Sequence, residues 1–335
     1  MKVFITGIDG ILGSTLKEKL RAKGHDVWGC DLTHSHDPQI VRGDVSEIGQ
    51  LGEALKHAEY AAGKKSIDLL YHFAAEFGRN NGRDFPEQLW KSNCLGTNNV
   101  IRMCVLRHLR MVFASSSEAY GLSEQYAGGA YLEEGMLDKY PPQFHNIYAL
   151  SKYTNERQIT MAVRNQGLRA IILRFFNIYG PPERYSPYRS VVCQFIYKML
   201  AGLPLTVNRG GYRTHLWIGD WANTVSNIAN DVRLRSLDKD YGNLSCPGSA
   251  FTPGVPVFNI GGVEYESIQD LYKRLAVLIP DSRSRVTFID NEEANTAMKR
   301  PANGLATVKL DHNPNTPLIE GLRKTVDWMK QEYKF

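Results

Sequence analysis

The sequence predicts an α/β protein built on a doubly wound parallel sheet, because apolar strands alternate with amphipathic helices through the first 180 residues. The strand segments KVFIT, IDLLYHFAA and RMVFASSS are nearly continuous apolar runs, which is typical of parallel strands buried on both faces. Beyond residue 180 the segments shorten, and proline and glycine become frequent. We therefore expect a second, smaller and less regular domain.

The expected elements of the first part follow one another along the chain without an internal repeat. Strands are expected at 2–6, 25–31, 67–75, 110–117 and 168–180. Helices are expected at 11–24, 47–58, 89–107 and 148–167. In an open α/β sheet the ligand crevice lies beyond the carboxyl ends of the strands, so a second domain over those ends would close it.

Composition limits the classes of partner. The net charge is 40 − 35 = +5, without a basic run longer than two residues, so a nucleic-acid binder is not expected. The five cysteines form no CxxC pair, and no clear set of three or four metal ligands is visible, so neither a disulfide framework nor a metal site is expected. No apolar run reaches the ~18 residues of a membrane helix, and the first residues enter a strand pattern at once. We expect a cytoplasmic protein without membrane contact.

The first strand runs into a glycine turn, TGIDGILG, which carries Gly7, Gly10 and Gly13. Glycines between a strand and a helix let backbone N–H groups approach a pyrophosphate at the helix N-terminus. Asp31 ends the second expected strand, 18 residues beyond Gly13, where a carboxylate accepts hydrogen bonds from ribose hydroxyls and repels a 2′-phosphate. The pattern predicts NAD rather than NADP, and a solvated turn aspartate is the alternative. Asp44 and its neighbour Val45 follow the next short strand and could reach the adenine, although a helix N-cap explains Asp44 equally well.

Tyr148 and Lys152 stand four residues apart in YALSK, so an expected helix presents them on one face. A neighbouring ammonium and an oxidised nicotinamide favour the phenolate, which predicts that the pKa of Tyr148 is lowered toward the operating pH. Such a phenol can take a proton from a sugar hydroxyl while hydride leaves the same carbon. The segment SSSEAYG, at the end of the fourth long strand, adds a carboxylate, Glu118, which is costly at a buried strand end unless it has a use there.

Together these motifs resemble the extended short-chain dehydrogenase/reductases, in the branch of nucleotide-sugar epimerases, dehydratases and decarboxylases. The resemblance rests on the glycine turn, HFAA, the NxxGTNN helix, SSSEAYG, YALSK and RFFNIYGP, and continues in FNIGG, AMKRPA and NPNTPLIEGLRKTVDWM. It implies a Rossmann-type NAD-binding domain over 1–180, with returning segments near 214–235 and 256–262. A mixed α/β nucleotide-sugar-binding domain would then cover 181–213 and 263–335. The family retains NAD and oxidises the sugar at C4 before hydride returns.

Roles carry over by position from this resemblance. Ser116 matches the residue that hydrogen-bonds the C4 oxygen, Tyr148 the base, and Lys152 the residue that holds the cofactor ribose. Implied cofactor contacts are Gly7, Gly10, Ile11, Leu12, Gly13, Asp31, Leu32, Asp44, Val45, Phe73, Ala74, Ala75, Asn93, Ser115, Tyr148 and Lys152. Implied substrate contacts are Glu76, Gly78, Arg79, Ser116, Ser117, Glu118, Tyr148, Asn177, Val191, Arg213 and Arg300. Arg213 and Arg300 suit a diphosphate, since guanidinium forks pair with phosphate oxygens, and solvated surface charges are their alternative.

Glu118 decides which reaction the resemblance favours. Family dehydratases and decarboxylases carry glutamate at this position, whereas plain 4-epimerases carry a small or hydroxyl residue. As a base at C5, Glu118 predicts a 4,6-dehydratase, ahead of decarboxylation of a uronate and of 4-epimerisation; a structural role as a cap or as the partner of an arginine is the alternative. Two departures matter: Ser117 stands where thymidine-diphosphate-glucose dehydratases have aspartate, and the loop EFGRNNG (76–82) after HFAA is unlike the common epimerase loop. In this loop Glu76 is similar to the dehydratases, whereas Arg79 could hold a uronate carboxylate.

Two readings from other classes stay open beside this one. A non-catalytic NAD-sensing or scaffold protein is disfavoured by the presence of Ser116, Tyr148 and Lys152, because a sensor needs no general base. An NADP-dependent carbonyl reductase is disfavoured by Asp31. The resemblance also implies a homodimer paired through the helices at 93–107 and 148–164. An outer apolar stripe is expected there, formed by Val100, Cys104, Leu150 and Ile159.

Overall fold

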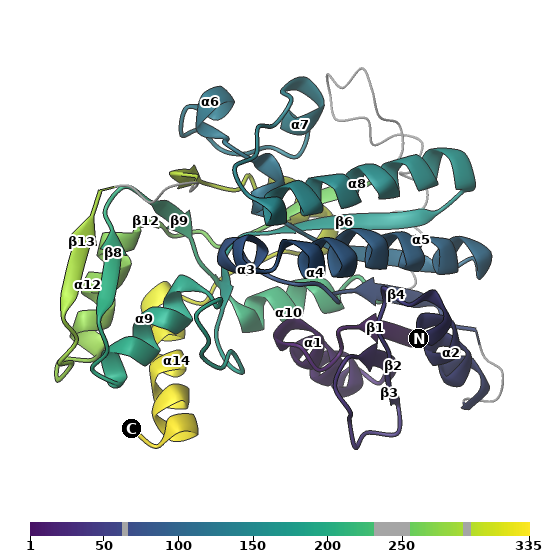
Figure 1. Cartoon of the computed structure of the whole chain (residues 1–335), viewed down its shortest axis with the longest axis horizontal. Coiled ribbons are helices and arrows are strands. Elements are labelled where there is room, and N and C mark those ends of the chain that lie inside the picture. Colours follow the sequence, from purple (N-terminus) through teal and green to yellow (C-terminus); the bar gives the residue numbers. More distant parts are fainter. Residues whose placement is uncertain (62–65, 231–254, 291–295) are drawn as a thin grey trace.

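The computed structural model describes residues 1–61, 66–230, 255–290 and 296–335 (Figure 1). Its N-terminus leads into an interior strand of the large sheet, and its C-terminus lies toward the other end of the long axis. Cys246 and the part of the expected returning segment beyond residue 230 fall outside the described residues.

A seven-stranded parallel sheet forms the centre, in the order β11-β6-β5-β4-β1-β2-β3. Chain order reverses between β1 and β4, and this switch point opens the crevice at the carboxyl ends of the strands. The predicted doubly wound sheet is therefore confirmed. The strands of this sheet are β1 (Lys2–Thr6), β2 (Asp26–Asp31), β3 (Ile40–Arg42), β4 (Leu69–His72), β5 (Arg110–Ser116), β6 (Arg169–Phe175) and β11 (Val257–Ile260).

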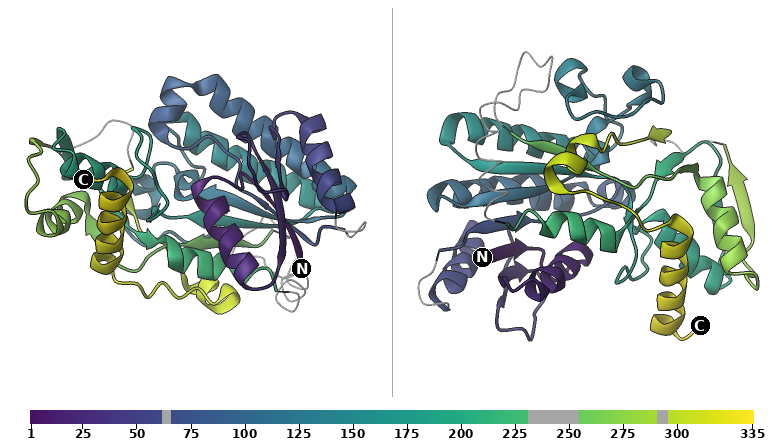
Figure 2. Two further views of the ribbon diagram at one scale, coloured as in Figure 1. Left: turned by 90° about the horizontal axis from the view of Figure 1, so that it is seen from below. Right: turned by 180° about the vertical axis from the view of Figure 1, so that it is seen from behind.

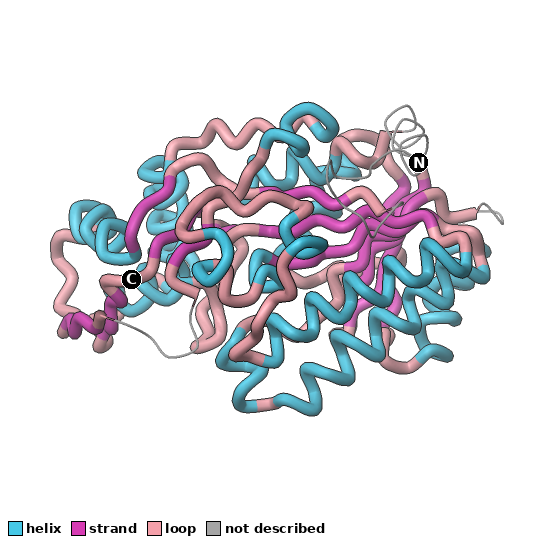
Figure 3. Tube along the Cα trace, turned by 90° about the horizontal axis from the view of Figure 1, so that it is seen from above, coloured by secondary structure: helices cyan, strands magenta, loops and turns pink. Residues whose placement is uncertain are grey.

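Helices cover both faces of this sheet, because successive strand residues point to opposite sides (Figure 3). Val3 and Ile5 of β1 pack toward α1 and α10, whereas Phe4 between them packs toward α2, α5 and α8. Each face thus has its own apolar core, which explains why the strands are continuous apolar runs. The covering helices are α1 (Ile11–Ala22), α2 (Ile48–Ala61), α5 (Gly96–Leu106), α8 (Ile147–Gln166), α10 (Ile218–Ser226) and α13 (Gly304–Leu310).

Helix α8, which carries the YALSK motif, has clear start and stop signals. The Asn146 side chain accepts a hydrogen bond from the Ala149 N–H at 2.7 Å, which satisfies one of the free donors at the helix start. Gly167 ends the helix in the left-handed conformation, with φ of 70°. These caps fix where the helix begins, and so they fix which residues face the crevice.

Shorter elements follow the strands of the large sheet and connect it to the rest of the chain. They are α3 (Arg79–Asp84), α4 (Pro86–Trp90), the π-helix η1 (Lys91–Leu95), the 3-10 helix η2 (Ser117–Tyr120), α6 (Glu124–Ala127), α7 (Met136–Lys139), β7 (Ile178–Tyr179) and β10 (Leu216–Trp217).

A separate apolar core lies toward the C-terminal end of the molecule (Figure 2). It is formed by α9 (Val191–Leu200), α12 (Ile268–Leu278) and α14 (Leu318–Tyr333), with the parallel pair β8 (Leu205–Asn208) and β13 (Val286–Ile289). A three-stranded sheet joins this end to the crevice: β9 (Tyr212–Thr214) pairs with β12 (Tyr265–Ser267) and β14 (Met298–Lys299). The exact division into two domains stays a prediction.

The expected outer stripe on α5 and α8 is wrong for three of its four residues. Val100, Cys104 and Ile159 are 0–1% exposed and belong to the core beneath the helices. The apolar stripe of each helix faces the core and not a partner subunit. The sequence pattern does not separate the two cases, because a core-facing side and a subunit interface are both apolar. Leu150 is exposed, and the outer face also presents Leu95, Leu106 and Met161.

None of the helices within the described ranges combines the length and the apolarity that crossing a membrane requires.

Candidate active site

The turn between β1 and α1 has the shape of a phosphate cradle. A Cβ on Gly13 would lie 2.1 Å from the Gly7 carbonyl oxygen, and a Cβ on Gly7 would lie 2.7 Å from the Ala74 backbone nitrogen. Gly10 caps α1 without any side-chain hydrogen bond, so no capping side chain occupies the backbone N–H groups of the first turn. Ile11 and Leu12 form that first turn. These residues fit the pyrophosphate of a dinucleotide.

Asp31 closes the cradle at the carboxyl end of β2. Its carboxylate accepts hydrogen bonds from the backbone N–H groups of Asp9 at 3.0 Å and Leu32 at 2.8 Å. These bonds fix the side chain beside the glycine turn, where the ribose of a dinucleotide lies in this fold.

Asp44 and Val45 are engaged by the protein itself. The Asp44 carboxylate accepts the Ser46 N–H at 2.8 Å and so turns the chain toward α2. Val45 is buried, and its carbonyl oxygen accepts a hydrogen bond from Asn99 at 3.0 Å. The contacts of Asp44 thus match the alternative of a backbone cap. An adenine contact at either residue stays a prediction.

The segment after β4 forms the floor of the crevice. Phe73, Ala74 and Ala75 leave the strand beside Gly7, and the Ala74 N–H donates to the Thr6 hydroxyl at 3.3 Å. Asn93 is buried behind this segment: its side-chain oxygen accepts the Glu76 N–H at 2.8 Å, and its amide donates to Ser151 at 3.1 Å. Asn93 therefore links the crevice floor to α8.

The catalytic residues predicted at the end of β5 and on α8 come together. The Ser116 hydroxyl lies near the Tyr148 phenol and acts on it as a hydrogen-bond donor that lowers its pKa, and the Ser116 oxygen accepts the Glu118 N–H at 3.2 Å. Lys152 lies one turn further along α8, with its Nζ 5.8 Å from the centre of the Tyr148 ring, and it donates to the Ala114 carbonyl at 2.9 Å. Ser115 instead donates its hydroxyl to the buried Glu156 at 2.5 Å.

The expected lowering of the Tyr148 pKa is wrong for the protein alone. Burial raises the pKa of the phenol, and the nearby negative charge of Glu118 adds to this, against the hydrogen bond from Ser116. Burial also lowers the pKa of Lys152 to about 8, against the opposing influence of Cys94 and Glu156. The sequence argument counted the neighbouring charge and left out the loss of water around both groups.

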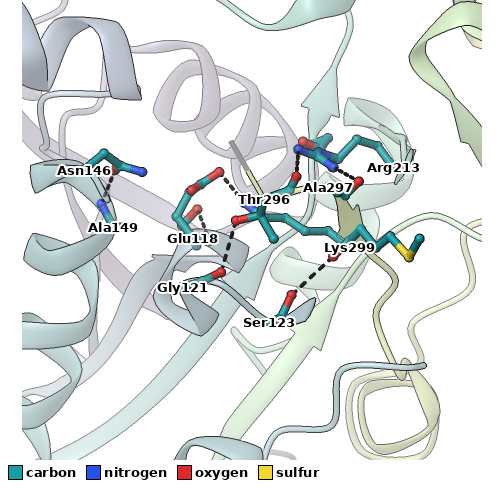
Figure 4. A network of polar contacts seen from close by, with 12 residues as sticks. Glu118, Gly121, Ser123, Asn146, Ala149, Arg213, Thr296, Ala297 and Lys299 are labelled. Carbon is teal, nitrogen blue, oxygen red and sulfur yellow. Dashed lines mark hydrogen bonds and ion pairs between the residues drawn. The ribbon is translucent and has the colours of Figure 1, made fainter. Parts of the chain in front are cut away.

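Glu118 forms an ion pair with Lys299, and its contacts are drawn in Figure 4. The lysine side chain is 1% exposed and the glutamate side chain 20%. Burial works to raise the pKa of Glu118, but Lys299, Arg213 and Arg79 together lower it. Burial lowers the pKa of Lys299 to about 8, and Arg213 and Arg79 contribute in the same direction against Glu118. One carboxylate thus lies among three cations.

Arg213 is buried, contrary to the surface alternative considered for it. Its guanidinium donates to the carbonyl oxygens of Tyr212 and Ala297, both at 2.8 Å, and to that of Thr296. Since Lys299 pairs with Arg213 across β14 and β9, these bonds hold Lys299 in place. Arg213 was predicted at the diphosphate, and the structure shows it fastening β14.

The other predicted substrate residues surround this cluster from different elements. Arg300 lies between two tyrosine rings, 4.0 Å from the centre of Tyr131 and 5.3 Å from that of Tyr265. Asn177 donates to the Thr214 carbonyl at 2.9 Å and so ties the end of β6 to β9. The remaining predicted residues lie at the N-terminus of α3 (Gly78), on the crevice floor (Glu76), in η2 (Ser117) and at the start of α9 (Val191).

Sequence reasoning missed Lys299. The residue stands in AMKRPA, which was used for the resemblance and for Arg300, but nothing local shows that this segment reaches the strand end 181 residues earlier. Pairing of β14 with β9 brings it there.

A family model described as the NAD dependent epimerase/dehydratase family matches residues 3–237. The chain belongs to this family. It is 26% identical over 333 residues to UDP-glucuronic acid decarboxylase 1 of Danio rerio, covering 99% of this chain and 73% of that protein. It is 27% identical over 352 residues to UDP-glucuronate 4-epimerase 1 of Arabidopsis thaliana, covering all of this chain and 78% of that protein.

A solved UDP-glucose 4-epimerase from Thermus thermophilus, in complex with NAD, shares the fold. Its TM-score is 0.79 at 22% identity, with 98% of each chain covered. The cofactor of the family is NAD, which would supply hydride transfer at a substrate carbon when bound. The glycine turn and Asp31 fit this cofactor on the contacts described above. Ser116 and Tyr148 lie together, and their roles at the reacting hydroxyl stay a prediction.

Proposed function

We propose that this protein decarboxylates a nucleotide-activated uronate, a sugar with a carboxylate at C6, through a 4-keto intermediate. The observation that carries the proposal is the Glu118–Lys299 ion pair among Arg79 and Arg213, beside the Ser116–Tyr148 pair. The three charged groups that lower the pKa of Glu118 are all cations, and Glu124 also acts on Arg213, so cations outnumber these two carboxylates in a largely buried place. A further carboxylate, supplied by the substrate, would offset that excess.

Dehydration, which the sequence favoured, fits this arrangement less well. It asks Glu118 to remove the C5 proton, and a general base works best with a pKa near the operating pH. Three cations lower the pKa of this carboxylate, and Lys299 is bonded directly to it. A 4-keto uronate needs no base at C5, because its C5–C6 bond breaks with loss of CO₂.

Epimerisation of a neutral nucleotide sugar at C4 would leave the Glu118–Lys299 ion pair without a use. That reaction requires groups at the C4 oxygen, which Ser116 and Tyr148 supply, and nothing beyond. The relatives give further support for a uronate, since the Danio rerio protein is named a UDP-glucuronic acid decarboxylase and the Arabidopsis thaliana protein a UDP-glucuronate 4-epimerase. A non-catalytic NAD sensor would need neither the Glu118–Lys299 ion pair nor the Ser116–Tyr148 pair.

The test is a product assay on a panel of nucleotide sugars, with and without a C6 carboxylate. We expect loss of CO₂ from at least one nucleotide uronate, with UDP-glucuronate as the first probe. Loss of water from a neutral nucleotide sugar would support dehydration instead, and an unchanged mass with altered configuration at C4 would support epimerisation.

We also propose that the protein is a cytoplasmic homodimer. The described cysteines Cys30, Cys94, Cys104 and Cys193 are free and buried, which suits a reducing compartment. The exposed apolar side chains on the outer faces of α5 and α8 support pairing of two subunits there.

A further inference from the structure

We propose that Glu156 is a positioning residue of the reaction, which keeps the Lys152 ammonium charged and in place beside Tyr148. The inference rests on the chemistry at C4 that the proposed function needs, and it adds a residue to the Ser116, Tyr148 and Lys152 set. It does not depend on whether the 4-keto sugar then loses CO₂. Its basis is a buried ion pair on the same helix face.

The side of α8 that faces the sheet carries ionisable groups one helical turn apart. Tyr148, Lys152 and Glu156 recur at a spacing of four residues, and all three are buried. A buried carboxylate is costly unless it is paired and hydrogen-bonded, and an apolar side chain of similar size would meet a packing role alone. The charge of Glu156 therefore calls for a use beyond packing.

Consecutive residues at the end of β5 receive this face of α8. The Ala114 carbonyl accepts a hydrogen bond from the Lys152 Nζ at 2.9 Å, and the Ser115 hydroxyl donates to the Glu156 carboxylate at 2.5 Å. The residue that follows Ser115 is the predicted contact of the C4 oxygen. Neighbouring residues of one strand thus hold the ammonium and the carboxylate close together, and the negative charge of Glu156 acts on Lys152.

Arg174 on β6 fixes the carboxylate from a second strand. Its guanidinium donates to both oxygens of Glu156, at 2.9 and 2.7 Å, and the two side chains are 1% and 0% exposed. It also donates to the Tyr120 hydroxyl of η2 at 3.0 Å. Burial works to raise the pKa of the carboxyl group, but Arg174, the Ser115 hydroxyl and Arg157 together lower it. The group is therefore ionised at neutral pH, and the bidentate pair sets its position.

Titratable groups also face Lys152 from η1, from β4 and from α8 itself. Cys94 on η1 would act on the ammonium as a thiolate, but burial raises the pKa of that thiol to about 11. Burial and the charge of Lys152 lower the pKa of His72 on β4 to about 3, and burial raises the pKa of Tyr148. These three groups are neutral near pH 7. Glu156 thus supports the ammonium against burial, which lowers its pKa to about 8.

Removing the charge of Glu156 should let Lys152 lose its proton at lower pH. A nearby opposite charge shifts a pKa by roughly one unit or more, so the pKa of Lys152 should fall below about 8. A neutral amine no longer favours the Tyr148 phenolate. The alkaline limb of kcat/KM should therefore move to lower pH, whereas loss of a merely structural contact would lower kcat/KM by one factor at every pH.

Variants of the pair separate the charge from the packing. Glu156→Gln removes the charge, and its combination with Arg174→Met also avoids an unpaired buried guanidinium, which destabilises a fold. Glu156→Asp keeps a carboxylate on a shorter side chain, so its alkaline limb should stay close to that of wild type even where kcat falls. Glu59→Gln, which breaks the ion pair between α2 and Arg107 after α5, is the matched control and should change neither limb nor rate.

The decisive readout follows Lys152 itself. NAD-loaded protein labelled with ¹³C at the lysine Cε is titrated by NMR, and Lys152→Arg assigns the signal. We expect this signal to titrate roughly one pH unit lower in the double variant than in wild type, and the alkaline limb to move with it. Thermal unfolding and retained NAD check that the variants are folded.

Equal titration of Lys152 in wild type and the double variant would overturn the inference. A lower titration together with kcat/KM reduced by one factor at every pH would overturn it as well. The NMR titration needs no turnover, and the pH profile is taken with whichever nucleotide sugar the protein converts. If wild type released CO₂ from no nucleotide uronate, the proposed decarboxylation would fail, while the Lys152 signal would still decide the role of Glu156.

Discussion

Replacing Glu118 by glutamine should lower the free energy of unfolding only moderately, because Lys299 can become neutral by giving up its proton. In wild type, burial shifts the pKa of Lys299 from 10.5 to about 8, a penalty of ~3.4 kcal/mol for the charged amine at ~1.36 kcal/mol per unit. Without Glu118 the pKa falls further. Once it passes pH 7 the amine is neutral, which limits the added cost at that pH to ~1.4 kcal/mol. A lost hydrogen bond adds ~1 kcal/mol.

The pH dependence has a definite sign. The ion pair requires Glu118 ionised, which holds above its lowered pKa, and Lys299 protonated, which holds below about 8. Its stabilisation is therefore present at neutral pH and is lost as pH rises through about 8. The burial penalty on charged Lys299 is relieved over the same rise, so its own contribution to stability increases between about pH 8 and pH 10.5.

Urea unfolding of wild type and Glu118→Gln, followed by tryptophan fluorescence at about pH 7 and about pH 9.5, measures this difference. We expect a gap in the free energy of unfolding of ~1–2.5 kcal/mol at the lower pH and little at the higher. Equal gaps at both values would contradict the electrostatic account. In activity, CO₂ release should persist in Glu118→Gln, and a loss beyond roughly 10³-fold would return Glu118 to the role of C5 base.

Three further outcomes follow from the site and the surface. Tyr148→Phe should lower turnover by roughly 10²-fold or more while NAD stays bound, and activity within threefold of wild type would remove the tyrosine from its role. Asp31→Ala should narrow the preference for NAD over NADP, measured as the ratio of their binding constants, because it removes both the ribose acceptor and the repulsion of a 2′-phosphate. Light scattering should give about twice the 37.8 kDa subunit mass. A paired Leu106→Glu and Met161→Glu variant should give a monomer, and an unchanged mass in that variant would place the interface elsewhere.

Local sequence patterns were enough to predict the large sheet and the part of the site that lies on its first strands and on α8. The glycine turn, Asp31 and the YALSK spacing lie on consecutive βα units, so their positions follow from the fold class alone. Ser116 and Tyr148 meet because parallel strands end at one edge and α8 begins at its Asn146 cap.

Other features depended on contacts that no local pattern encodes. Lys299 reaches Glu118 only through the pairing of β14 with β9, across 181 residues of sequence. The apolar residues of α5 and α8 recur with the helical period, but this period does not tell which face of each helix is buried. Only the packing shows that Val100 and Ile159 point inward. The pKa of Tyr148 went the wrong way because burial, which a sequence does not show, outweighs the neighbouring charge.

One measurement tests the central claim most directly. Wild-type protein, with its bound NAD, is incubated with UDP-glucuronate and its guanosine- and thymidine-diphosphate counterparts, each labelled with ¹³C at C6. The account predicts that the label leaves as ¹³CO₂ and that the sugar product retains C5 without C6. Full retention of the label in every product, with water lost or C4 inverted, would contradict it.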